Sequence, residues 1–297
     1  MNKVLTLCVF LASLSSLNAQ DRLPADSVNT QINTKKSYGV IGINYSNDWV
    51  YMGRKDSIKV PYITPRASYY HQSGIFISTS LAYLVAESSN RVDLVAIRAG
   101  YDYFGKRIST GVSVVDYFYN KDSYNVQSEM TFYASAYVGY DFDIFETEVS
   151  GGFGFSDNTD GFVNTELNRS FYLINSNLKI VPSVRANWGT QQYYDEYYST
   201  RSSSVKGMMG SGKGKVGSGG GTTDEIVTVF IDESSKFQLL DYEFAVYMVY
   251  YINNLRISFA PTYAIPVNPS RVTIDQDTFI EELDNVFFWS AGISYRF

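Results

Sequence analysis

Cysteine and histidine are almost missing from this sequence. Its 297 residues contain one Cys and one His. The cysteine, Cys8, lies in an apolar stretch near the N-terminus, so the chain beyond it has no thiol for a disulfide framework or for thiol chemistry. Histidine is the most frequent general base. Because the single His71 lies in the turn-like sequence HQSG, we expect a solvated turn residue and no catalytic triad.

Long apolar runs and a basic charge excess are missing as well. Residues 1–19 join a lysine, a short apolar run and a final small residue, the pattern of a secretory signal peptide. After it, no window reaches the ~18 consecutive apolar residues of a transmembrane helix. The formal net charge of -6 provides no basic surface, so nucleic acid is not an expected partner.

Aromatic residues and period-two alternation are abundant instead. The chain has 26 Tyr and 19 Phe, and apolar residues alternate with polar ones in segments of about 10 to 16 residues. Globular strands usually have about 5 or 6 residues, whereas membrane-spanning strands need about 9 to 11. The expected strands are 37–46, 59–70, 74–86, 91–104, 107–120, 127–142, 143–155, 161–175, 178–191, 236–251, 254–266 and 286–297.

The connections between these segments alternate between short and long. Short connections such as HQSG and FGK alternate along the chain with longer connections such as NDWVYMGRKDSI. Bacterial outer-membrane barrels have short periplasmic turns and longer external loops. Residues 37–297 are therefore predicted to form an all-β, closed antiparallel up-and-down transmembrane β-barrel of about 12 strands. Both termini are expected on the periplasmic side.

The parity of each strand assigns its two faces. In 178–191, alternate residues are apolar, while Lys179 and Arg185 lie on the other face. Large apolar faces opposite charged ones are typical of lipid outside and a polar lumen inside. In 161–175, Arg169 falls in the apolar parity, which predicts a β-bulge.

Two segments fall outside this pattern. Residues 20–36 are polar and are expected to be a periplasmic leader. Residues 192–235 contain a Gly/Ser/Lys tract that cannot bury enough apolar surface to become ordered. We expect 192–235 to be a long flexible external loop, with Tyr-rich flanks that extend its two strands as a protruding hairpin.

The last strand resembles the C-terminal signal of outer-membrane β-barrel proteins, which the barrel-assembly machinery recognises. The matching residues are Trp289, Ala291, Ile293, Tyr295 and Phe297. Over most of its length the chain is similar to outer-membrane barrels of the Bacteroidota type, notably at 50–65, 91–109 and 259–269. This resemblance implies an outer-membrane, porin-like barrel of the cell envelope, and it transfers no catalytic residue.

Charged residues on the inward parity are the candidate functional residues. Such charges can form a constriction that selects a solute, or they can pair with one another and stiffen the barrel; the sequence leaves both interpretations open. The expected lumen-lining charges are Arg66, Arg98, Arg107, Glu146, Glu148, Glu166, Lys179, Arg185, Asp241, Glu243, Arg256 and Arg296.

No motif predicts a metal or a cofactor. The acidic stretch 273–284 lacks the spacing and the glycine of an EF-hand, and the glycine-rich tract lacks the strand-then-helix context of a phosphate-binding loop. The sequence therefore predicts a non-enzymatic narrow solute channel or structural envelope barrel. The alternative is a surface-binding or adhesion module, or a subunit of an envelope complex, that acts through its external loops. Expected partners are outer-membrane lipid, the barrel-assembly machinery, and a small solute or surface partner.

Overall fold

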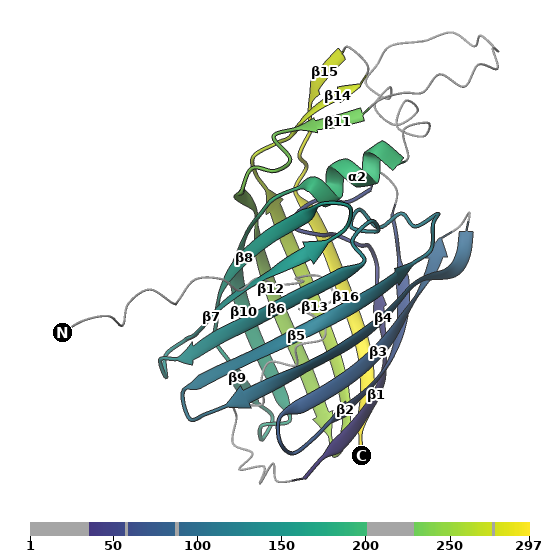
Figure 1. Ribbon diagram of the computed structural model, residues 1–297. Helices are drawn as coiled ribbons and strands as arrows, with labels where there is room; N and C mark the ends of the chain where they lie inside the picture. The colour runs from purple at the N-terminus through teal and green to yellow at the C-terminus, as the bar shows by residue number, and fades with distance from the viewer. Residues whose placement is uncertain (1–35, 57–58, 87–88, 201–228, 275–276) are drawn as a thin grey trace.

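The chain folds into a closed barrel of twelve antiparallel strands (Figure 1). The computed structural model describes residues 36–297 except 57–58, 87–88, 201–228 and 275–276. The first wall strand pairs with the last, from Val40 opposite Arg296 to Ser46 opposite Ser290, and this pairing closes the sheet. The predicted fold class and strand number are confirmed.

Each wall strand pairs with its neighbour along the chain. The strands are β1 (Tyr38–Ser46), β2 (Tyr62–Tyr70), β3 (Ile75–Ala86), β4 (Ser89–Phe104), β5 (Ile108–Tyr119), β6 (Phe132–Asp141), β7 (Glu146–Phe155), β8 (Thr159–Asn168), β10 (Leu178–Gly189), β12 (Gln238–Ile252), β13 (Leu255–Pro266) and β16 (Val286–Arg296). A short strand β9 (Phe171–Leu173) continues β8, and both pair with β10. The break between them falls at Arg169, where the apolar alternation of the sequence fails.

The two ends of the barrel differ. The short-turn end carries the connections 71–74, 105–107, 142–145, 174–177 and 253–254, and it also holds the start of β1 and the end of β16 (Figure 1). The opposite end, called the long-loop end below, carries the longer connections 47–61, 120–131, 190–237 and 267–285, and also the short turn 156–158. This arrangement follows from local sequence, because polar turn residues interrupt the alternation at nearly regular intervals.

The outward face of the wall is apolar. On β1, Ile41 and Ile43 are 52% and 46% exposed, and the same holds for alternate residues around the barrel. Exposed aromatic side chains occur near both edges, among them Tyr45, Tyr83, Phe118, Phe287, Tyr69, Tyr101, Phe145 and Tyr295. Among the described residues, no helix has the length and apolar character needed to cross a membrane.

Beyond the long-loop end lie a helix and a small sheet. Helix α2 (Gln192–Thr200) lies over the barrel, and β11 (Val229–Asp232), β14 (Arg271–Ile274) and β15 (Asp277–Ile280) form a separate three-stranded sheet (Figure 1). The expected protruding hairpin at 192–235 is therefore wrong in its described part, because the first flank forms helix α2 and β11 of the second flank pairs with β14. Residues 201–228, the signal peptide and nearly all of the leader lie outside the described residues.

Candidate functional site

The connection between β1 and β2 folds into the barrel at the long-loop end. Residues 47–56, the plug hairpin, turn at Met52 and Gly53, whose φ angles are 48° and 75°. The N–H groups and carbonyls of Tyr51 and Arg54 form reciprocal hydrogen bonds of 2.8 and 2.9 Å. Two successive positive φ angles match the right-handed twist of a hairpin, and glycine accepts them without strain. The tip is therefore a tight two-residue turn.

The plug hairpin packs into an apolar core inside the upper barrel. Tyr51 and Met52 are both 0% exposed. The Tyr51 ring meets Phe162 of β8 at 5.9 Å and Tyr193 of α2 at 5.1 Å between centroids, in edge-to-face geometry. Such pairs stabilise beyond the area that they bury. Other core members are Val60, Tyr62, Leu84, Leu94, Tyr117, Met130, Tyr133, Tyr197 and Leu240.

This core corrects the expectation of a polar lumen throughout. Inward-facing residues of the upper wall are apolar because they pack against loops that fold inward, and the sequence parity alone could not distinguish a loop from water inside the barrel. In the lower half most inward-facing side chains are polar. Arg66, Arg98, Glu148 and Ser258 are half-buried, whereas Lys179 and Arg256 are buried. The interior is thus closed at the long-loop end and retains solvent contact toward the short-turn end.

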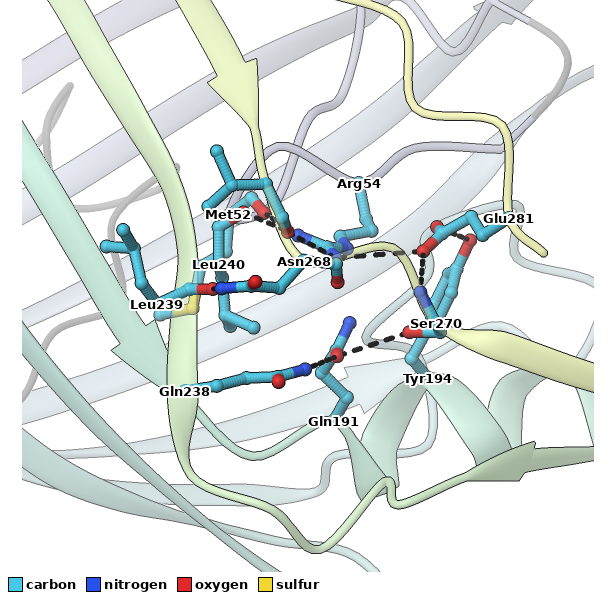
Figure 2. Close-up of polar contacts among 11 residues, drawn as sticks. Met52, Arg54, Gln191, Tyr194, Gln238, Leu239, Leu240, Asn268, Ser270 and Glu281 are labelled. Carbon is cyan, nitrogen blue, oxygen red and sulfur yellow. Dashed lines mark hydrogen bonds and ion pairs between the residues drawn. The ribbon is translucent and has the colours of Figure 1, made fainter.

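Arg54 holds the plug hairpin to the wall (Figure 2). Its side chain is 0% exposed, the largest fully buried one among the described residues. Its Nη1 donates to the Leu240 carbonyl at 2.6 Å, and its Nη2 donates to the carbonyls of Val267 and Asn268 at 3.1 and 3.0 Å. Nη2 also lies 3.7 Å from Oε2 of Glu281. A planar guanidinium presents donors in a fixed fork, so one side chain fastens the hairpin to β12, to the end of β13 and to the following loop.

Glu281 links this attachment to the structures above the barrel. Its Oε2 accepts the Ser270 N–H at 3.0 Å, and its Oε1 accepts the Tyr194 hydroxyl of α2 at 3.1 Å. Gln191 accepts hydrogen bonds from Ser270 Oγ and Gln238 Nε2, both at 3.2 Å. Figure 2 shows these side chains converging between the helix and the start of β12. The plug, α2 and the base of the β14–β15 hairpin are therefore connected.

Helix α2 begins at a carboxylate from the wall. Asp160 of β8 accepts the N–H groups of Gln192 and Tyr193 at 2.8 and 2.7 Å. These are donors without intrahelical partners, and a carboxylate is favourable at this end of a helix. Tyr193 and Tyr197, one turn apart, face the core and are 0% and 1% exposed. Burial raises the pKa of the Tyr51 and Tyr193 hydroxyls, so both stay neutral.

A second inward connection, 120–131, fills the other side of the mouth. Asp93 of β4 accepts hydrogen bonds from the Tyr62 hydroxyl, from Ser123 Oγ at 2.6 Å and from Arg91 Nε at 3.0 Å. Both oxygens of this buried carboxylate therefore accept hydrogen bonds from the loop and its neighbours, and these bonds offset the cost of burying the charge. The loop side chain of Met130 is 1% exposed in the core.

Below the plug tip, β8, β10 and β12 carry a polar ladder. Gly53 fits against β12 so closely that a Cβ atom would lie 2.9 Å from that of Asp241 and 2.8 Å from that of Pro266. Asn187 donates to Asp241 at 2.6 Å and accepts a hydrogen bond from Asn164. Asp241 is 0% exposed. The tip of the plug hairpin therefore packs against Asp241, which belongs to a buried, hydrogen-bonded row of polar side chains in the wall.

The next rung contains three of the predicted lumen-lining charges. Arg185 of β10 pairs with Glu166 of β8 and, at 2.9 Å, with Glu243 of β12. These three residues are direct register partners across the sheet. Because the arginine is held from both sides, this part of the wall is rigid.

The other candidate residues are spread over the lower interior. Arg66, Arg98, Glu146, Glu148, Lys179, Arg256 and Arg296 all lie on inward-facing positions of wall strands. Arg98 donates to Ser113 Oγ at 3.1 Å, and Arg296 stacks on the Tyr38 ring at 3.8 Å. Arg107 lies in the β4–β5 turn, where its half-exposed side chain pairs with Asp143 at 2.5 Å and does not line the lumen. The alternation of a strand assigns a face only to residues within the strand, so it could not assign Arg107, which lies in a turn, to the lumen.

The five C-terminal signal residues lie on the outward face of β16. Phe297 and Gly39 exchange backbone hydrogen bonds of 3.0 and 3.1 Å, and a Cβ on Gly39 would approach the Phe297 ring to 2.6 Å. The last residue thus covers the seam between β16 and β1. Its role in assembly stays a prediction.

Across the part of the chain that the structure describes, no group of three or more His, Cys, Asp or Glu side chains is placed to hold a metal ion. His71 lies exposed in the β2–β3 turn, with Nδ1 2.8 Å from Ser73 Oγ. That turn is at the short-turn end, away from the plug.

Comparisons with known proteins find solved structures of outer-membrane proteins and no related sequence. No family model and no curated protein matches the sequence. The KdgM porin aligns over 86% of this chain and 98% of its own, with 10% identity and a TM-score of 0.45. An outer-membrane channel from Pseudomonas putida F1 aligns over 88% and 96%, with 8% identity and a TM-score of 0.44. LpxR from Salmonella typhimurium aligns over 86% and 99%, with 12% identity and a TM-score of 0.43. At these identities the similarity concerns the barrel fold alone.

Sequence reasoning missed the plug, although one signal was present. The connection NDWVYMGRKDSI contains four large apolar residues beside a glycine and an arginine. Such large apolar residues are not expected in a solvated external loop, and a glycine at a two-residue turn predicts a hairpin. Where the hairpin would pack could not be read from the sequence.

Proposed function

We propose that this protein is an integral outer-membrane β-barrel and a narrow solute channel, non-catalytic, whose mouth is closed by the plug hairpin in the state described. The apolar outward face supports the membrane location, because soluble proteins rarely expose contiguous apolar surface of this extent. Aromatic residues near both edges fit the two membrane interfaces.

One observation carries the channel proposal. The element that closes the interior is a loop hairpin, whereas the wall below it carries mostly polar inward-facing side chains, several of them half-buried. A barrel with a purely structural role would be served by wall side chains that fill the interior at every level. A closing loop can move without disturbing the sheet, because the plug hairpin pairs with itself and is held by Arg54 and by the packing of Tyr51 and Met52 in the core.

The test is conductance in planar bilayers. The wild-type protein is expected to conduct rarely, and a variant in which residues 49–56 are replaced by a Gly/Ser segment of equal length is expected to show frequent discrete openings. Heat-dependent gel mobility of both proteins checks that the barrel is folded. A folded replacement variant that is as silent as the wild type would refute the channel.

The orientation belongs to the same proposal. Short turns are typical of the periplasmic side, so both termini are assigned there. A Lys121→Cys variant should react with an impermeant maleimide on intact cells, and a Lys106→Cys variant should not. The reverse labelling would invert the orientation.

A second function is favoured by the sheet outside the barrel. Strands β11, β14 and β15 stand beyond the wall, and Phe279 and Ile280 on the edge strand are 47% and 66% exposed. Exposed apolar residues at a sheet edge can pair with a partner. Deletion of 271–280 that abolishes a cell-surface binding phenotype, with conductance of the replacement variant unchanged, would favour the surface module over the channel.

A further inference from the structure

The charges of the lower interior are sorted onto two arcs of the barrel wall. One arc, β7 to β12, carries four inward carboxylates against two cations: Glu146, Glu148, Glu166 and Glu243 against Lys179 and Arg185. The other arc runs from β13 through β16 and β1 to β4, and it carries four arginines against one carboxylate: Arg66, Arg98, Arg256 and Arg296 against Asp102. Asp141, at the rim of β6, extends the acidic side.

The closed topology places β1 to β4 of the arginine arc opposite β7 to β12, whereas β13 and β16, with Arg256 and Arg296, follow β12 and face β5 and β6. In a barrel of twelve strands, each strand faces the one six positions further round. Strand β2, with Arg66, therefore faces β8, with Glu166. Strand β4, with Arg98, faces β12, with Glu243. The sequence order alone does not reveal this, because the facing strands are separated by long stretches of chain.

Solvent reaches both arcs. Arg66, Arg98 and Glu148 are half-buried, and the side chains of Arg185 and Glu166 are 15% and 23% exposed. Small hydroxyl side chains lie between the charges on the same inward parity, among them Ser78, Ser80, Ser258, Thr262 and Ser294. A small solute in this space would be close to positive charge on one side and negative charge on the other.

We propose that this interior selects small zwitterionic solutes, with the ammonium group toward the β7–β12 arc and the carboxylate toward the arginine arc. A simple cation or anion is attracted by one arc and repelled by the other, whereas a molecule with both charges is attracted by both. The effective dielectric constant between protein walls is below that of bulk water, which strengthens both contacts. This inference rests on the channel function proposed above.

The test uses the full-length variant with residues 49–56 replaced, reconstituted into liposomes. Glycine and its neutral isomer glycolamide have the same atoms, so their sizes match and their charge distributions differ. Glycine uptake is expected to be about threefold faster or more, a factor that corresponds to less than one charge-assisted contact. Equal rates, or faster glycolamide uptake, would overturn the zwitterion selection.

Neutralising one arc at a time gives a second measurement. In the same background, Arg66→Gln with Arg98→Gln should abolish the glycine preference and shift the reversal potential in a salt gradient toward cation selectivity. Glu146→Gln with Glu148→Gln should shift it toward anion selectivity. The matched control is Lys106→Gln, which removes an exposed charge from the β4–β5 turn and should change neither readout.

The outcomes separate the two proposals. Openings with no glycine preference, or with the same reversal potential in both double variants, would leave the channel intact and refute the selection. A replacement variant that folds and does not conduct refutes the channel, and the selection with it. Folding is checked by heat-dependent mobility, and the single variants Arg66→Gln and Glu148→Gln provide milder changes, each expected to give a smaller shift in the same direction.

Discussion

Replacing Arg54 by alanine should release the plug hairpin. The wild-type guanidinium is fully buried and donates to three wall carbonyls. Arg54→Ala removes all of these contacts, together with the cation that faces Glu281. The variant should therefore conduct through openings that are rare in the wild type.

The magnitude follows from what each partner loses. The Leu240 carbonyl keeps the Val267 N–H at 2.8 Å, so its loss is small. The carbonyls of Val267 and Asn268 lose the Arg54 donor. Val267 is half-buried, so its loss costs about 1–3 kcal/mol, whereas Asn268 is exposed and water can replace the donor. Glu281 keeps two donors, those of Ser270 and Tyr194, so its loss is modest. The closed state should be destabilised by about 3 kcal/mol, within the ~3–5 kcal/mol seen for broken buried pairs, which corresponds to roughly a 150-fold increase in the open population.

The assay is the open probability of single channels in planar bilayers. Arg54→Lys retains a cation but loses the fork, so an intermediate open probability is expected. Lys59→Ala is the matched control, because Lys59 lies in the same β1–β2 connection, outside the plug hairpin, and is exposed. If Arg54→Ala opens no more often than Lys59→Ala, the attachment through Arg54 is not what keeps the mouth closed.

Three further predictions test the plug, the helix and the seam. Gly53→Val should also raise the open probability, because its Cβ would lie 2.8 Å from that of Pro266 at a φ of 75°. An unchanged open probability would show that the turn of the plug hairpin accommodates a larger side chain. Asp160→Ala should lose the α2 cap, at about 1 kcal/mol, and hydrogen exchange of the helix amides should accelerate while wall amides stay protected. Deletion of Phe297 should lower the amount of barrel inserted in the membrane, because the residue ends the C-terminal signal and covers Gly39; equal surface levels would contradict this.

The wall could be predicted from the sequence because its signals are local. The alternation of apolar and polar residues fixes which face of each strand is outward, and the turn residues fix where each strand ends. Even the interruption at Arg169 is visible as a break in parity. Helix α2 was missed because the Tyr-rich sequence 192–200 has strand-like composition, and its start depends on Asp160, more than 30 residues earlier.

What the sequence by itself determined is the barrel wall: about twelve strands in up-and-down order, the outward apolar face and the inward parity of most charges. The faces follow from an alternation that repeats every two residues, and the strand ends follow from the turn residues between the alternating segments. Only the tertiary structure decided what fills the barrel. The plug hairpin is held by carbonyls 186 to 214 residues away from Arg54, and the two charge arcs face each other only once β16 pairs with β1. Closure and inward folding depend on contacts between distant segments, and no local pattern encodes them.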